Sequence, residues 1–291
     1  MTARIHNASV PIAVCLGGTM TLKLMSFMSL IASTSVVHAA ASDGVAPTGK
    51  WTVNFRDAQC VATRAYGSEK KPLFLALKAP AVGDVMQIAV MQQSYGMGAS
   101  QVEADIRFDR LSPVQTTMLT FNSDDRKLRV HLLNMPAADF VPARGAQTLT
   151  VSATDFREQF ALTLMDPLLQ VMERCVADLR QAWNADEGQG GQAPGGTRAS
   201  GNLRNIFKSS DYPDLPLHNE QTGTVRVAAL IDEMGRVADC TILETSGWAM
   251  LDGQSCAIIK ARAIFTPARD PDGKPVKDAV IRSVTWRLRE G

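Results

Sequence analysis

The sequence predicts an α+β protein with two domains. The first is a β-rich domain closed by one C-terminal helix, and the second is a small αβ domain with an antiparallel sheet. Strand-like alternation of apolar and polar residues recurs through the first half of the chain. One helical apolar stripe follows it, and a Gly-rich stretch then separates the two halves. The length of 291 residues also agrees with two domains.

The charge balance and composition exclude several classes of protein. The chain has 30 Lys and Arg against 29 Asp and Glu, and 45% of its residues are hydrophobic. Such a composition is typical of a globular protein rather than a disordered chain or a polytopic membrane protein. Proteins that neutralise many phosphates need an excess of basic residues, so we expect no nucleic-acid partner.

Residues 1–39 are predicted to be a secretory signal peptide. Lys23 precedes an apolar run at 24–32, and residues 37–39 have the form of a cleavage site. Translation from Met20 would give a compact signal of about twenty residues. The alternative is an uncleaved membrane anchor, although the run is short against the roughly twenty apolar residues that a span requires. We therefore expect export, with inner-membrane anchoring if the segment is retained.

The first domain, residues 48–184, is predicted to combine nine strands with one helix. The expected strands are 51–55, 61–66, 73–77, 85–92, 102–108, 116–121, 128–133, 148–151 and 159–164. Asp166 is expected to cap the helix, and Pro167 suits its first turn. The helical stripe consists of Leu168, Met172, Cys175, Val176, Leu179 and Trp183.

Residues 185–202 are predicted to be a flexible linker, because they contain six Gly and no aliphatic residue larger than Ala. The second domain, residues 203–291, follows. A turn at 232–235 joins two strands, 224–231 and 237–243, into a hairpin. A helix at 250–263 and a final strand at 279–288 complete the domain.

The cysteines predict two disulfides. Cys15 belongs to the predicted signal peptide, which leaves an even number of cysteines in an exported chain. Three pairings of those four are possible, and the division into domains selects Cys60–Cys175 and Cys240–Cys256. In each pair one cysteine lies on a strand and the other on the helix expected to cover it. The chain-entropy model gives nearly 5 kcal/mol for the first bridge and about 3 kcal/mol for the second.

A series of short motifs runs through the second domain. In order, they are Tyr212-Pro213, Gly223–Val227, Ile231–Val237, Ser246-Gly247, Leu251-Asp252, Phe265–Ala268, Asp272–Val276 and Trp286–Leu288. Together these motifs resemble the TonB C-terminal domain family. The resemblance covers a little over a quarter of the chain and leaves the first domain unassigned.

The resemblance implies a periplasmic module with a small antiparallel sheet. In that family an inner-membrane complex energises the protein with the proton-motive force, and the C-terminal domain binds the TonB box of outer-membrane transporters by strand addition. The expected partners are such transporters or other envelope proteins, with the inner-membrane energising complex as a further candidate. The segment just before Tyr212 is another candidate contact. The expected partner-binding residues are Tyr212, Pro213, Val280, Ile281, Arg282, Ser283, Val284, Thr285 and Trp286.

Three departures from the family pattern support an alternative function. The long Pro-rich spacer is missing, and Thr34 with His38 replaces the Ser-x-x-x-His arrangement of the family's anchor. Pro216 also interrupts a stretch where family members usually carry a helix. The alternative is therefore a soluble periplasmic binding or structural module without energy coupling.

Few residues suit catalysis or metal binding. Beyond the predicted signal peptide the chain keeps only His131 and His218. We expect His131 to face solvent from a strand and His218 to lie in an exposed loop. Zinc modules use paired CxxC spacings, which the sequence lacks. We therefore expect no metal, no cofactor and no enzymatic activity; a secreted enzyme would require His131 close to a Ser or Cys nucleophile.

Overall fold

The structure is a computed structural model that describes residues 44–56, 58–93, 98–123, 127–185, 196–203 and 205–288. The predicted signal peptide lies outside the described residues, as do residues 186–195 of the predicted linker. All described residues belong to one compact unit. We call residues 44–185 the β-rich region and residues 196–288 the C-terminal region.

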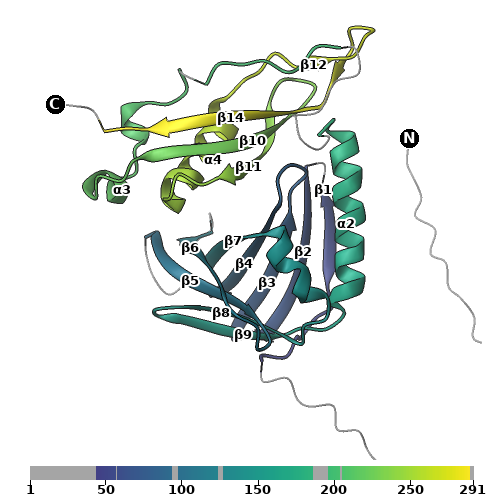
Figure 1. Ribbon diagram of the computed structural model, residues 1–291, viewed down its shortest axis with the longest axis vertical. Helices are drawn as coiled ribbons and strands as arrows, with labels where there is room; N and C mark the ends of the chain where they lie inside the picture. Colours follow the sequence, from purple (N-terminus) through teal and green to yellow (C-terminus); the bar gives the residue numbers. More distant parts are fainter. Residues whose placement is uncertain are drawn as a thin grey trace, which may run out of the picture. The chain divides into compact units, whose positions relative to one another are not determined.

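The β-rich region is built on one antiparallel sheet, which contains nine strands within the described residues (Figure 1). Its strands are β1 (Thr52–Arg56), β2 (Gln59–Ser68), β3 (Lys71–Ala79), β4 (Val85–Gln93), β5 (Ser100–Phe108), β6 (Val114–Asn122), β7 (Leu128–Pro136), β8 (Thr148–Ala153) and β9 (Phe156–Ala161). The strand order is β1-β2-β3-β4-β7-β6-β5-β8-β9. Each of these strands overlaps a predicted one. The last ends early, because Leu164 has a φ of 59° and leads into a helix.

Residues 44–49 connect β9, an edge strand of this curled sheet, to β2, which lies next to the other edge strand β1. The amide of Val45 donates to the Gln159 carbonyl of β9 at 2.7 Å, and the amide of Thr48 donates to the Ala65 carbonyl of β2 at 3.0 Å. The Arg64 side chain, 7% exposed, donates to the Gly49 carbonyl at 2.9 Å. Backbone groups of β9 and of the part of β2 that extends beyond β1 are therefore partly satisfied by this segment, which limits further strand pairing there.

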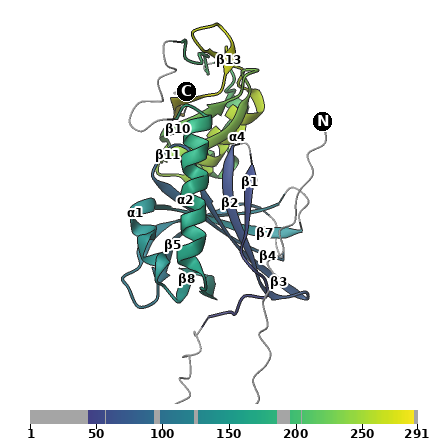
Figure 2. The same ribbon diagram turned by 90° about the vertical axis from the view of Figure 1, so that its right-hand side faces the viewer.

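Helix α2 (Met165–Ala182) covers one face of the sheet (Figure 2). Its buried side chains repeat at helical spacing and join the main apolar core; they are Met165, Leu168, Leu169, Met172, Cys175 and Leu179. The Cys60–Cys175 disulfide ties α2 to β2. The prediction that Asp166 caps this helix is wrong: Leu164 holds the N-cap position, and Asp166 accepts hydrogen bonds from Arg144 and Gln170 instead. The short helices α1 (Ala137–Phe140) and η1 (Val141–Arg144) precede β8.

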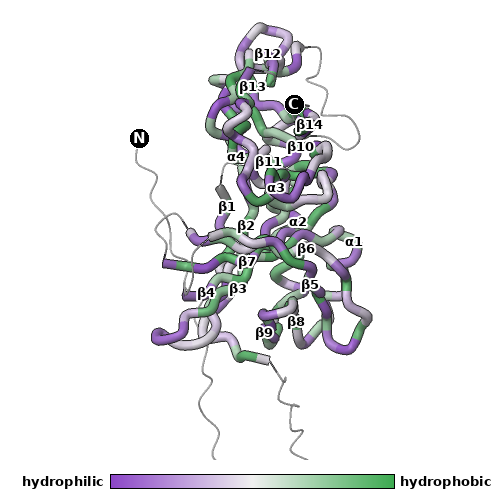
Figure 3. Tube along the Cα trace, turned by 90° about the vertical axis from the view of Figure 1, so that its left-hand side faces the viewer, coloured by the Kyte–Doolittle hydropathy of each residue, from purple (hydrophilic) through white to green (hydrophobic). Residues whose placement is uncertain are grey.

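The C-terminal region has a three-stranded sheet in the order β11-β10-β14. Its strands and helices are η2 (Ser209–Asp211), α3 (Asp214–His218), β10 (Gly223–Ile231), β11 (Val237–Glu244), α4 (Ala249–Arg262), β12 (Ala268–Arg269), β13 (Pro275–Val276) and β14 (Asp278–Trp286). The β10–β11 hairpin pairs antiparallel as predicted. The Cys240–Cys256 disulfide ties β11 to α4. These antiparallel sheets and few helices confirm the α+β class, and Figure 3 shows apolar residues recurring along the strands of both sheets.

Pro216 does not prevent a helix in the C-terminal region. It is the third residue of α3, where the backbone amides still lack intrahelical acceptors, so its missing N–H costs little. Its side chain is buried. The expectation that Pro216 interrupts a helix here is therefore wrong for a helix this short.

Residues 197–200 pair with residues 266–278 of the same region. The amides of Thr197 and Ser200 donate to the carbonyls of Arg269 and Thr266 at 2.9 and 3.0 Å. Arg198 and the amide of Ala199 bond to the carboxylate of Asp278, which is fully buried. This end of the predicted linker sequence is thus fixed along one side of the region.

Contacts between the two regions gather around a buried carboxylate of β11. Asp239 is 2% exposed and accepts hydrogen bonds from Lys78 Nζ at 2.9 Å and Gln59 Nε2 at 3.0 Å. Oδ1 of Asp239, which accepts from Gln59, also lies 3.6 Å from Lys260 Nζ of α4. Leu230 and Ala279 of the smaller sheet are also buried in the apolar core that contains α2. Side chains of β11 therefore contact the β-rich region.

Candidate peptide-binding groove

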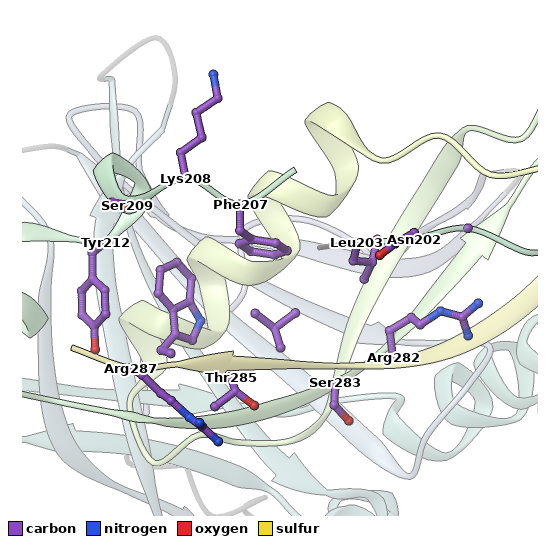
Figure 4. A pocket seen from close by; sticks show the side chains of 13 residues that line it. Asn202, Leu203, Phe207, Lys208, Ser209, Tyr212, Arg282, Ser283, Thr285 and Arg287 are labelled. Atoms are coloured by element: carbon purple, nitrogen blue, oxygen red, sulfur yellow. The ribbon is translucent and has the colours of Figure 1, made fainter. Parts of the chain in front are cut away.

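A groove with a volume of about 660 Å³ runs beside β14 (Figure 4). One wall is the strand itself, and the other is the segment that precedes α3. The lining residues are Gly201, Asn202, Leu203, Phe207, Lys208, Ser209, Tyr212, Arg282, Ser283, Val284, Thr285, Trp286 and Arg287.

Strand β14 is an edge strand. Within the described residues it pairs only with β10, in a continuous antiparallel register from Asp278 to Trp286. Its side chains alternate at the groove, since Ser283 and Thr285 are exposed whereas Val284 and Trp286 are packed in the core. An edge strand presents unpaired N–H and C=O groups along one side, which can pair with an extended chain.

Three aromatic rings form the apolar part of the groove. The ring centroid of Trp286 lies 5.8 Å from that of Phe207 and 5.1 Å from that of Tyr212, both in edge-to-face geometry. Trp286 Nε1 donates to Ser255 Oγ at 2.8 Å, and the Tyr212 hydroxyl donates to the Gln221 carbonyl. Burial raises the pKa of Tyr212, so this hydroxyl stays protonated at neutral pH. The Trp286 and Tyr212 rings are thereby held in place by polar contacts, and Phe207 packs against Trp286.

The wall opposite β14 is fixed to helix α4 through Asp211. Its carboxylate accepts two hydrogen bonds from Arg262, at 2.6 and 2.9 Å, and one from the Lys208 amide at 2.7 Å. Arg262 also donates to the Ile206 carbonyl at 3.0 Å. The hydrogen bonds from Arg262, followed by that from the Lys208 amide, lower the pKa of Asp211. The hydrogen bonds to Asp211 raise the pKa of Arg262. Bidentate pairing of this kind sets the orientation of the segment as well as its position.

The charged side chains that line the groove among the described residues are all basic. They are Lys208, Arg282 and Arg287, and none of the described lining residues is Asp or Glu. Arg282 also lies over the Phe265 ring, with its guanidinium carbon 5.7 Å from the ring centroid. The groove therefore combines an open strand edge, an aromatic patch and positive charge.

The structure brings most of the predicted partner-binding residues together. Tyr212 and residues 282–286 line the groove, whereas Pro213, Val280 and Ile281 do not. Val280 is 5% exposed and packs in the core beneath the sheet. Phe207, Lys208 and Arg287 line the groove without having been predicted individually. The only signal for the first two was their position just before Tyr212.

The prediction that His131 faces solvent is wrong. The side chain is 6% exposed, on the face of β7 that also carries the buried Leu133 and Met135. Its Nδ1 lies 2.9 Å from Thr120 Oγ1 and its Nε2 lies 3.1 Å from Gln92 Nε2. Burial, helped by the charge of Arg129, lowers the pKa of His131 to about 4. The ring is thus neutral and held by core side chains at physiological pH.

Among the described residues, no cluster of three or more His, Cys, Asp or Glu side chains has the arrangement of a metal site. No helix in the same part of the chain combines the length and apolar character needed to cross a bilayer.

A small αβ sheet with an open, groove-lined edge is typical of modules that bind extended peptides. Residues 208–288 match the family described as Gram-negative bacterial TonB protein C-terminal. The resemblance seen in the sequence is therefore confirmed for this segment. The segment contains the groove residues from Lys208 to Arg287. Comparisons of the chain with curated proteins and with solved structures found no match.

Proposed function

We propose that the protein is a TonB-like component of the bacterial envelope that binds partner proteins by strand addition to β14. An extended segment of the partner would enter the groove and pair with residues 281–286. The observation that carries this proposal is the unpaired edge of β14, which lies in a segment that matches the TonB C-terminal family.

The contacts around the small sheet support β14 over β11 as the binding edge. Side chains of β11 contact the β-rich region, through the Asp239 hydrogen bonds to Lys78 and Gln59. A partner at β14 instead meets polar and aromatic side chains, including the exposed Ser283 and Thr285. Backbone hydrogen bonds would supply affinity there, while the aromatic patch would accept an apolar side chain of the partner.

The family supplies the proposed biological setting. We place the protein in the periplasm, with outer-membrane TonB-dependent transporters or other envelope proteins as partners of β14. Coupling to the proton-motive force requires contact with an inner-membrane complex, and therefore an N-terminal segment retained as an anchor. The protein would then act in energy-dependent transport across the outer membrane and would be a binding protein, not an enzyme.

A second proposal is a soluble periplasmic module that has the same groove but no energy coupling. The family match favours it in one respect, since the match covers only residues 208–288 and leaves the N-terminal segment unmatched. Sequencing the N-terminus of the protein from the cell envelope separates the two roles. A start near Ala40 in the periplasmic fraction supports the uncoupled module, and an intact N-terminus in the inner-membrane fraction supports coupling.

Strand addition is tested with backbone-modified peptides. TonB-box peptides from transporters of the same organism are titrated into the chain from residue 40 onward, and affinity is measured by fluorescence anisotropy. N-methylation of every second peptide amide removes the donors that face one side of an extended chain. One methylation set should abolish binding and the alternate set should leave it nearly unchanged. Equal tolerance of both sets would contradict strand addition, and no binding by any unmodified peptide would contradict the transporter-coupling role.

A further inference from the structure

The three basic side chains of the groove have no close acidic partner among the described residues. Lys208, Arg282 and Arg287 form no ion pair within the described residues. The charge of Lys208 acts to lower the pKa of Asp211, and the charge of Arg282 acts to lower the pKa of Asp278. Both carboxylates already pair with other arginines of the region: Asp211 with Arg262 and Asp278 with Arg198. Positive charge in the groove is therefore available to a ligand.

The positions of these cations define a spacing. Arg282 lies on β14 and Arg287 directly follows the strand, five residues further along the chain. At about 3.3 Å per residue, five residues of extended chain span roughly 16 Å. In Figure 4, Arg282 lies at one end of the groove and Arg287 lies toward the other end, where Tyr212 is found. Phe207 faces the strand between them.

A partner strand with acidic residues opposite Arg282 and Arg287 would form favourable cross-strand pairs, whereas basic residues at those positions would be destabilising.

We propose that the groove selects extended partner segments that carry an acidic side chain at each end of a stretch of about six residues, with an apolar side chain between them. This specificity rests on the proposed strand addition to β14. The acidic side chains would pair with Arg282 at one end and with Arg287, aided by Lys208, at the other. The apolar side chain would contact the Phe207, Tyr212 and Trp286 rings.

Three matched peptides test this specificity on the chain from residue 40 onward. They share length and an apolar centre, and carry Glu, Gln or Lys at two positions five residues apart. Exposed ion pairs typically contribute a factor of about two to five each, so the Glu peptide should bind about five- to tenfold more tightly than the Gln peptide. The Lys peptide should bind most weakly. Raising the salt concentration should reduce the difference, because exposed charges are screened.

Charge-neutral variants locate the effect in the groove. Arg282→Gln and Arg287→Gln should each reduce the Glu-over-Gln preference about two- to fivefold. Lys70→Gln, at an exposed position in the turn between β2 and β3, is the matched control and should leave the preference unchanged. Circular dichroism and thermal unfolding of each variant establish that the fold is retained.

The outcomes separate this inference from the function on which it rests. Equal binding of all three peptides, with binding still abolished by one N-methylation set, would overturn the acidic preference and leave strand addition intact. Binding of none of them would contradict both. A preference that persists in the Arg282→Gln/Arg287→Gln double variant would place the selectivity elsewhere and overturn the inference. A β14-dependent dimer in sedimentation that excludes the Glu peptide would also overturn it.

Discussion

Both regions of the described chain have a helix cross-linked to a sheet, but the lengths of chain between the cross-linked residues differ. In each, a disulfide ties a helix to a strand of an antiparallel sheet, but the sequence separation is 115 residues for Cys60–Cys175 and 16 for Cys240–Cys256. In the β-rich region, residues 44–49 also connect β9 to β2. In the C-terminal region, α4 packs on the sheet and leaves the edge of β14 open. We propose from this comparison that the β-rich region supplies most of the stability, and that the open edge of the C-terminal region is the one that binds a partner.

The largest expected effect is the loss of stability when each disulfide is removed, and it should be greater for the longer loop. In the chain-entropy model a longer closed loop restricts the unfolded chain more. Cys60→Ala/Cys175→Ala should therefore lower the free energy of unfolding by about 5 kcal/mol, and Cys240→Ala/Cys256→Ala by about 3 kcal/mol. Urea unfolding followed by circular dichroism measures both. A larger loss from the shorter bridge would reverse the proposed division of stability.

Acid should destabilise the β-rich region through His131. Its pKa is about 4 in the fold, against 6.5 for an ordinary His, so the unfolded chain takes up the proton first as the pH falls. This contribution is complete above about pH 6.5 and is lost progressively toward pH 4, and it amounts to about 3 kcal/mol.

His131→Gln should flatten that pH dependence, measured as the free energy of unfolding between pH 7 and pH 4.5. His218→Gln is the control, because His218 is exposed on α3. If the wild-type chain and both variants show the same slope, the neutral, buried state of His131 does not contribute to acid sensitivity.

The contact between the two regions should depend on Asp239. Asp239→Asn removes the charge that pairs with Lys78 and leaves polar groups of both regions poorly matched, so we expect a loss of about 2 kcal/mol. Glu244→Gln on the same strand removes an exposed pair with Arg226 and should cost less than about 1 kcal/mol. Similar losses from the two variants, measured by urea unfolding, would argue against a buried ionic contact between the regions.

The smallest effect is expected at the groove wall. Asp211→Asn weakens the bidentate pair with Arg262 and should loosen the segment that carries Phe207, which reduces affinity for the Glu peptide about two- to fivefold. Because the pKa of Asp211 is lowered, the pair should persist from pH 7 to pH 5 and break only in stronger acid. Asp214→Asn, at an exposed position in α3, is the control. Unchanged affinity in Asp211→Asn would show that this pair does not organise the groove.

The sequence predicts local features of this protein better than the contacts between distant segments. Period-two alternation locates the strands of the larger sheet because side chains of a strand alternate between its faces. This alternation does not say which face of a strand is buried. For that reason the prediction that the His131 side chain faces solvent is wrong. The order in which β4 pairs with β7, and β5 with β8, depends on long-range packing that no local pattern encodes.

The groove shows the same limit. The TonB-like motifs locate β14 and Tyr212, which form part of the lining. Phe207 contacts Trp286 in the fold because the segment that carries it is held against α4. The pair that holds it, Asp211 and Arg262, joins residues some 50 positions apart in the sequence. Lys208 likewise lines the groove because its segment is held by the Asp211–Arg262 pair. Local patterns therefore predict the strand that lines the groove but not the wall opposite it.

Amide hydrogen exchange with and without a saturating TonB-box peptide tests strand addition to β14 most directly. Strand addition should slow exchange of outward-facing amides within residues 281–286 and leave β11, residues 237–244, nearly unchanged. Slowed exchange in β11, or no change in β14 while the peptide is bound, would contradict the account.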